Sequence, residues 1–135
     1  MSDTVGLVRK VPMFAELDDD EMTWVADLAT EFEVAAGFVL LERGQPGSGM
    51  FIITDGTVTV QLPQGPVELG PGEFVGELPL LADGITRIAR VRAKTPVRAL
   101  AISRAAFSEL LERQPSVAVR MLPVLARRLA EAESS

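Results

Sequence analysis

The segment from Phe74 to Val91 carries a carboxylate and a guanidinium at a spacing that could hold a hydroxylated anion. Glu77 directly follows Gly76, and glycine lets the backbone adopt positive φ or approach a ligand closely. Arg87 lies ten residues after Glu77. A carboxylate accepts a hydrogen bond from a hydroxyl, and arginine binds phosphate through two parallel hydrogen bonds. The pair therefore predicts a site for a sugar phosphate, such as a nucleotide monophosphate or its cyclic ester.

Alternation along the stretch after Thr86 places Arg87 on an otherwise apolar face. Residues two apart on a strand share a face. The residues between those of the Arg87 face form the opposite face, which is mostly basic and is expected to contact solvent. If the apolar face points inward, the guanidinium is buried and requires an anion. A structural ion pair between Glu77 and Arg87, with no ligand, is the alternative. The expected inner face comprises Arg87, Ala89, Val91 and Ala93, and the outer face Ile88, Arg90, Arg92 and Lys94.

The elements that would position these residues begin with a helical segment. Asp18 and Glu21 form a capping-box pattern, which predicts a helix that starts after Asp18 and ends near Thr30. Val11–Phe14 reads as an extended or turn segment that docks Phe14 on the core. At the other end, Ser103 is a good N-cap for a helix over Arg104–Glu112.

A last helix is expected from about Ser116 to Ala130, with Pro123 inside it. Its Leu122, Leu125 and Leu129 share one face, which reads as core, as a lid or as a dimer seam.

Between the helices, short runs rich in Val, Ile, Phe and Thr alternate with Gly and Pro. Asp55-Gly56 reads as a two-residue hairpin turn, and Leu78–Leu81 as a short helical turn. The pattern predicts a mainly β fold, an eight-stranded antiparallel jelly-roll β-barrel with an N-terminal helix and two C-terminal helices. The expected strands are Phe32–Ala35, Phe38–Glu42, Gly49–Thr54, Thr57–Leu62, Val67–Leu69, Phe74–Val75, Arg87–Ala93 and Val97–Ile102.

The length of 135 residues favours a single domain. We expect residues 1–30 to form an N-terminal helical segment, 31–102 the barrel and 103–131 the lid helices.

The composition excludes several classes of chemistry. There is no histidine and no cysteine, which removes Ser-His-Asp catalysis, thiolate chemistry and most zinc sites. A net charge of −6 disfavours direct nucleic-acid binding. No apolar run is long enough to span a membrane. The sequence thus predicts a cytoplasmic, non-enzymatic protein with no metal and no cofactor; an enzyme on a similar jelly roll is the disfavoured alternative.

Gly72-Glu73-Phe74-Val75-Gly76-Glu77-Leu78, followed by Arg87-Ile88-Ala89, resembles the phosphate-binding cassette of the cyclic nucleotide-binding domain family. This is the module of catabolite activator proteins, protein kinase A regulatory subunits and cyclic-nucleotide-gated channels. The resemblance extends from about Leu7 to Leu129 and suggests a stand-alone bacterial form. It implies that Glu77 accepts the ribose 2′-hydroxyl and that Arg87 binds the phosphate oxygens. The full set of ligand-binding residues it implies is Gly76, Glu77, Leu78, Arg87, Ile88 and Ala89.

The same resemblance implies a regulatory module that binds cAMP, or possibly cGMP, and signals by movement of its last helix. Ile88, in place of the family's usual small or hydroxyl residue, favours cAMP over cGMP. No aromatic residue is available on the last helix to cap a purine, which leaves Leu122, Leu125 or Arg127. The output would be a homodimer or an effector protein at that helix. The alternative is a degenerate member that binds no nucleotide and acts as a protein-interaction domain.

Overall fold

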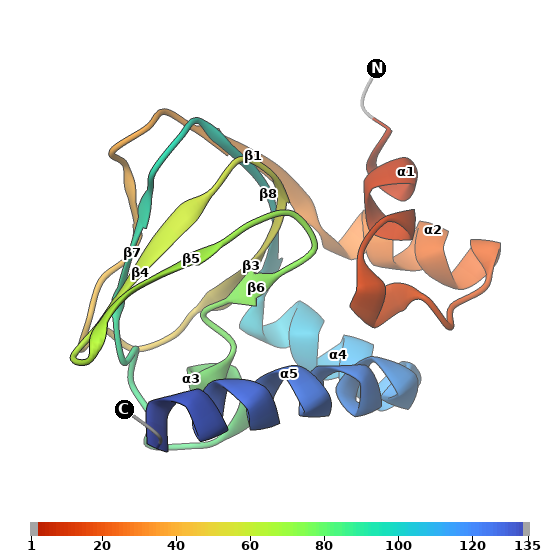
Figure 1. Ribbon diagram of the computed structural model, residues 1–135. Helices are drawn as coiled ribbons and strands as arrows, with labels where there is room; N and C mark the ends of the chain where they lie inside the picture. The colour runs from red at the N-terminus through yellow and green to blue at the C-terminus, as the bar shows by residue number, and fades with distance from the viewer. Residues whose placement is uncertain (1–2, 134–135) are drawn as a thin grey trace.

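Two antiparallel four-stranded sheets pack face to face, with helices at both ends of the chain beneath and beside them (Figure 1). The computed structural model describes residues 3–133. The first sheet has the order β1-β8-β3-β6 and the second β2-β7-β4-β5. The mainly β prediction is confirmed, but the barrel is not closed, because the edge strands of one sheet do not pair with those of the other. The strands are β1 Thr30–Val34, β2 Val39–Leu41, β3 Gly49–Asp55, β4 Val58–Leu62, β5 Gly65–Leu69, β6 Phe74–Val75, β7 Arg90–Ala93 and β8 Val97–Ser103.

Alternation along β3 and β8 gives the first sheet two apolar faces. Phe51 lies opposite Ala101 and Ile53 opposite Ala99, and these side chains point between the sheets. Their sequence neighbours, such as Ile52 and Leu100, point outward and pack against the helices. A sheet covered on both sides in this way fixes the register, because a slip of one residue would exchange the two faces.

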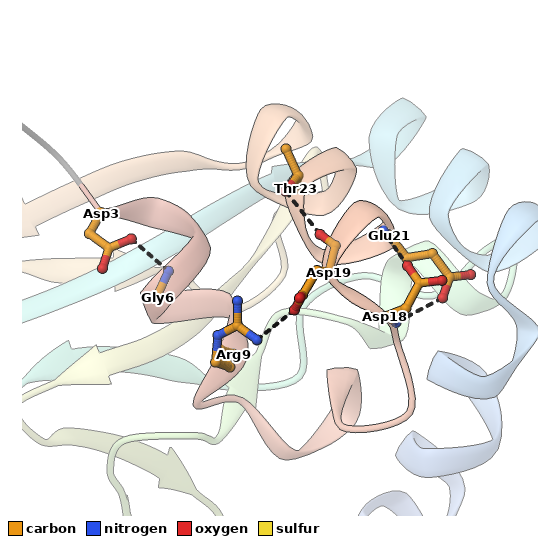
Figure 2. Close-up of polar contacts among 7 residues, drawn as sticks. All are labelled: Asp3, Gly6, Arg9, Asp18, Asp19, Glu21 and Thr23. Carbon is orange, nitrogen blue, oxygen red and sulfur yellow. Dashed lines mark hydrogen bonds and ion pairs between the residues drawn. The ribbon is translucent and has the colours of Figure 1, made fainter.

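The N-terminal segment contains three short helices, where one was expected. α1 (Thr4–Arg9) and the 3₁₀ turn η1 (Pro12–Phe14) precede α2 (Asp19–Leu28). Figure 2 shows the predicted capping box, in which the Asp18 carboxylate accepts from the Glu21 N–H at 2.8 Å and the Glu21 carboxylate accepts from the Asp18 N–H at 2.9 Å. Phe14 is fully buried, as predicted.

The hairpin predicted at Asp55-Gly56 is wrong. β3 and β4, which this turn joins, belong to different sheets, so the chain crosses from one layer to the other here. The corner is held by the neighbouring turn: the Thr57 N–H donates to the Thr95 hydroxyl and the Lys94 N–H to the Thr57 carbonyl. The true hairpin joins β4 to β5, where Leu62 lies opposite Gly65.

Three helices follow within or after the sheets. α3 (Leu78–Leu81) is the short turn expected after Glu77, and α4 (Arg104–Arg113) begins at the predicted cap, Ser103. α5 (Pro115–Glu133) continues through Pro123 and runs beneath the sandwich from α4 toward α3 (Figure 1). No helix among residues 3–133 is long and apolar enough to cross a bilayer.

The face of α5 predicted from its leucines is core-facing only in part. Leu122 and Leu129 are exposed, Leu125 packs against the core, and the fully buried side chains of the helix are Val117 and Met121. The core interpretation is therefore wrong for Leu122 and Leu129, while the dimer seam stays a prediction. Both stripes of this helix are apolar, so periodicity alone could not identify the stripe that faces the core.

Candidate functional site

Gly76 brings the two halves of the predicted site into contact. Its φ of +87° is a conformation that other residues adopt only with strain. A Cβ placed on Gly76 would lie 2.7 Å from Arg87 Nη1 and 3.1 Å from Leu41 Cδ1. The backbone at Gly76 is thus packed directly against the guanidinium, an approach that a side chain would block.

Arg87 is buried, and it has no carboxylate partner within residues 3–133. It lies in the loop before β7, not on the strand as predicted, because its N–H donates to the Gln45 carbonyl and its own carbonyl accepts from Gly44. The inward orientation expected from alternation is nevertheless confirmed, since the residue is 9% exposed. Nη2 donates to the Gly49 carbonyl at 3.1 Å. Nη1 is buried and has no hydrogen-bond partner within residues 3–133.

A cavity of about 300 Å³ has Arg87 among its lining residues. Its size is at the lower end of the range for small-ligand sites. Phe51 and Ala101, on the inner face of the first sheet, form part of its apolar wall, and Ser48 and Ser103 supply hydroxyls. A buried arginine beside a cavity of this kind can bind an anion that enters from it.

Glu77 is the second buried charge, at 4% exposure. It stands at the N-cap of α3, and its carboxylate does not line the cavity beside Arg87. The ion pairs of residues 3–133 include none between Glu77 and Arg87, so the structural pairing considered as an alternative is absent there. Instead, Arg128 Nη1 donates to Glu77 Oε1 at 3.0 Å.

Burial shifts the pKa of both charged groups toward their neutral forms. Desolvation raises the pKa of Glu77, and the charge and hydrogen bond of Arg128 oppose that rise. Desolvation also lowers the pKa of Arg87, with no opposing anion. An entering phosphate would supply that missing partner, so the electrostatics of the site favour an anion.

The other predicted site residues alternate around Arg87 as expected. Ile88 points outward and is 55% exposed, whereas Ala89 is buried. The outward position means that the bulk of Ile88 does not fill the inner space. Leu78 is half-buried at the start of α3, next to Glu77.

Two arginines near α3, Arg104 and Arg128, were not among the site residues predicted from the sequence. Arg104, at the start of α4, donates to the Gly47 carbonyl at 2.9 Å and to the Pro79 carbonyl at 2.7 Å, and so joins the loop before β3 to α3. Arg128 occupies the inner side of α5, while Arg127, the guanidinium considered as a cap, is exposed. The spacing of Arg128 could have indicated that it faces inward, because it follows the buried Met121 by seven residues, which is two helical turns.

Two buried charged residues, Arg87 in the loop before β7 and Glu77 at the start of α3, thus lie on either side of Gly76, but they do not contact each other within residues 3–133. Residues 3–133 contain no cluster of three or more acidic side chains able to hold a metal ion. A buried guanidinium that lacks an anion, and a carboxylate that can accept from a hydroxyl, are groups that could bind a hydroxylated anion.

Residues 31–114 match the family model of the cyclic nucleotide-binding domain, and the chain belongs to this family. A cyclic nucleotide-gated potassium channel of Mesorhizobium japonicum is 38% identical over 112 residues, which cover 83% of this chain and 31% of the channel. Glutaminase 2 of Bradyrhizobium diazoefficiens is 34% identical over 128 residues, 90% of this chain and 20% of that protein. The chain therefore spans a third or less of these curated relatives.

Solved structures share the fold. Cyclic-AMP-bound PfPKA-R superposes with a TM-score of 0.83 at 22% identity, over 96% of this chain and 45% of that one. The catabolite activator protein of Thermus thermophilus gives a TM-score of 0.76 at 30% identity, over 90% of this chain and 60% of that one. The predicted family is confirmed by these matches together with the family model.

Proposed function

We propose that this protein is a non-catalytic regulatory module that binds a cyclic nucleotide at Gly76, Glu77 and Arg87. The observation that carries the proposal is the guanidinium of Arg87, which is buried beside a cavity and has one nitrogen without an acceptor among residues 3–133. The phosphate would bind Arg87, and the ribose 2′-hydroxyl would donate to Glu77. Leu78, Ile88 and Ala89 would supply the backbone that surrounds the ligand.

We favour cAMP over cGMP as the ligand. Ile88 offers no hydroxyl to a guanine base or to the phosphate, and its side chain points outward. The solved structure of PfPKA-R contains cAMP, which is a property of that protein. A comparison of the two nucleotides with the same protein sample decides between them.

Calorimetric titration with cAMP and cGMP tests the proposal, with Arg87→Met as the informative variant. Methionine fills similar space without a charge, so the variant should fold while losing the phosphate contact. We expect binding by the wild type and at least a tenfold loss in Arg87→Met, because one charge-assisted hydrogen bond contributes about 1.5–3 kcal/mol. Arg90→Met is the matched control, since Arg90 pairs with Glu42 at the protein surface.

Two outcomes of that titration would contradict the proposal. One is the absence of binding heat with both nucleotides, and the other is equal affinity in wild type and Arg87→Met. A melting curve provides a second measurement, because ligand at a hundredfold excess over Kd stabilises the folded state by about 2.7 kcal/mol.

The output of the module is proposed to pass through α5 to a second copy or to an effector protein. Val119, Leu122 and Leu129 are exposed apolar side chains on its outer side. A cytoplasmic location, and the division into helical segment, sandwich and lid helices, remain predictions.

The second candidate function is a protein-interaction domain that binds no nucleotide. The exposed apolar residues of α5 and the exposed Ile88 favour it, because large apolar side chains on a surface can bind partners. The absence of binding heat with both cAMP and cGMP in the calorimetric titration would support this second function.

A further inference from the structure

The guanidinium of Arg87 contacts two groups of residues, and the proposed nucleotide contacts involve only one of them. Nη1 faces the backbone of Gly76, since a Cβ there would lie 2.7 Å from it, and Glu77 follows Gly76 in the chain. Nη2 faces Gly49, whose carbonyl accepts from it at 3.1 Å. Gly49 lines the cavity, whereas Gly76 and Glu77 do not. The cavity is therefore a space beside Arg87 that the proposed ribose contact does not reach.

This cavity leads from exposed hydroxyl groups to the buried guanidinium. Thr30, Ser48 and Ser103 line the cavity and are exposed residues, whereas Arg87 is 9% exposed. An ion can thus enter at a polar, solvent-facing end and reach a positive charge inside. Among the described residues, 3–133, those that line the cavity include no aspartate or glutamate, so the cavity holds a cation and hydroxyl groups without a negative charge.

Arg87 has more hydrogen-bond donors than the protein around it accepts. A guanidinium carries five N–H groups. Within residues 3–133 the Gly49 carbonyl accepts one of them, and Nη1 is buried without a partner. A buried cation that lacks an anion is unfavourable, and desolvation accordingly lowers the pKa of Arg87 with no carboxylate to oppose it. In the nucleotide-free protein an anion from solution would remove this deficit.

The N-terminus of α4 lies at the same cavity and adds to the attraction. Ser103 caps this helix by accepting from the Ala106 N–H, and it also lines the cavity. The first turn of a helix carries partial positive charge, which favours an anion nearby. The hydroxyl of Ser103 keeps its own hydrogen, because the cap uses only its oxygen as an acceptor. The same residue can therefore cap α4 and donate to an ion in the cavity.

We propose that this cavity binds a small tetrahedral oxyanion, of the inorganic phosphate or sulfate class, between Arg87 and the hydroxyl groups of Ser48 and Ser103. Such an ion accepts hydrogen bonds in several directions at once, which suits a guanidinium on one side and hydroxyls on the other. The anion site is separate from the proposed nucleotide contacts at Gly76 and Glu77, and it is occupied without a nucleotide. The proposal therefore goes beyond the proposed function and does not depend on it.

Titration with sodium sulfate, followed by amide NMR of the isotope-labelled protein, tests the site directly. Sulfate is the probe because its charge does not change near neutral pH. At constant ionic strength, the amide signals of residues 48–51 and 101–103 should shift and reach a plateau. The net charge of −6 repels anions from the molecule as a whole, so a plateau indicates a local site. Shifts centred on other residues, or a drift without a plateau, would overturn the proposal.

Melting curves with and without sulfate test the role of Arg87. Sulfate stabilises folded proteins in general, because it is excluded from their surfaces, so the measure is the difference between wild type and Arg87→Met. With sulfate at about tenfold over its Kd, the Tm of the wild type should rise by about 5 °C more than that of the variant. Equal rises in the two proteins would overturn the proposal.

Ser48→Asp provides a second variant that leaves Arg87 in place. Ser48 is exposed, and its carbonyl, which accepts from the Arg104 N–H, is kept in the variant. A carboxylate at this position should take the place of the anion, so the NMR response of the cavity to sulfate should disappear. Ser108→Asp is the matched control, because Ser108 is an exposed serine of α4 outside the cavity. A wild-type response in Ser48→Asp would overturn the proposed location.

The same NMR titration with cAMP in excess separates the two sites. The cavity amides should still respond to sulfate, because the nucleotide phosphate is expected at Nη1 and the oxyanion at the Gly49 side of Arg87. Complete loss of the response would mean that both ions use one place, and it would overturn a separate site. If the wild type binds neither cAMP nor cGMP, the proposed function fails, while the nucleotide-free titration still decides whether the anion site exists.

Discussion

Gly76 and Arg87 share a contact that any side chain at position 76 would disrupt. We predict that Gly76→Ala destabilises the protein by about 3 kcal/mol, of which about 1–2 kcal/mol comes from positive φ and the rest from displacement of the guanidinium. The nearest atom to the new Cβ would be Arg87 Nη1, at 2.7 Å. Chemical denaturation measures the loss of stability, and calorimetry the accompanying loss of nucleotide affinity.

Gly37→Ala is the control for this prediction. Gly37 has a φ of +91°, but a Cβ there meets nothing within 4 Å. The control should show only the backbone cost of about 1–2 kcal/mol and normal binding. Equal losses of stability in the two variants would contradict a specific contact between Gly76 and Arg87.

Single residues of the site were predictable to different degrees from the sequence. Alternation placed Arg87 and Ala89 inward and Ile88 outward, and it did so although β7 begins only at Arg90. Arg128 escaped prediction because an arginine on an apolar stripe reads as solvated unless its acceptor is known. That acceptor, Glu77, is 51 residues away in the chain, and only the fold brings them together.

At the scale of elements, Arg104 is predicted to hold α3 against the loop before β3. Its guanidinium bridges the Gly47 and Pro79 carbonyls, so Arg104→Ala should cost about 1.5–3 kcal/mol and loosen both segments. Hydrogen exchange in residues 43–48 and 78–81 measures the loosening. Arg98→Ala, which removes an exposed pair with Glu33, should leave those segments unchanged.

Helix ends were more predictable than strand connections, and the reason is local. The Asp18 and Ser103 caps are hydrogen bonds over three residues, and both form as predicted. The turn at Asp55-Gly56 has hairpin chemistry, but the partners of β3 are β8 and β6. Such long-range pairing, not turn composition, decides which sheet a strand joins.

At the scale of the whole molecule, the division of the apolar residues between two layers was not visible in the sequence. Ile52 and Ile53 are adjacent, yet one packs against the helices and the other between the sheets. Short apolar runs of this kind fit a closed barrel or an open sandwich equally well. Strand pairing makes the structure a sandwich of two separate sheets, and the helices cover the outer face of one of them (Figure 1).

The outer side of α5 carries exposed apolar side chains, through which we predict that the molecule self-associates. Val119, Leu122, Ala126 and Leu129 follow one another at spacings of three, four and three residues, and all four are exposed. This is the spacing of a two-stranded coiled-coil seam, with Val119 and Ala126 at the first position of each heptad and Leu122 and Leu129 at the fourth. Because the seam covers only about two heptads, we predict a weak dimer whose population rises with protein concentration.

Analytical ultracentrifugation of the double variant Leu122→Glu/Leu129→Glu checks that prediction. Two carboxylates facing their symmetry copies would repel, so the variant should stay monomeric at concentrations where the wild type associates. Val67→Glu adds a charge at an exposed valine on β5, away from the seam, and should associate like the wild type. A wild type that stays monomeric at every concentration would refute a second copy as the partner of α5 and leave a different effector protein as the remaining candidate.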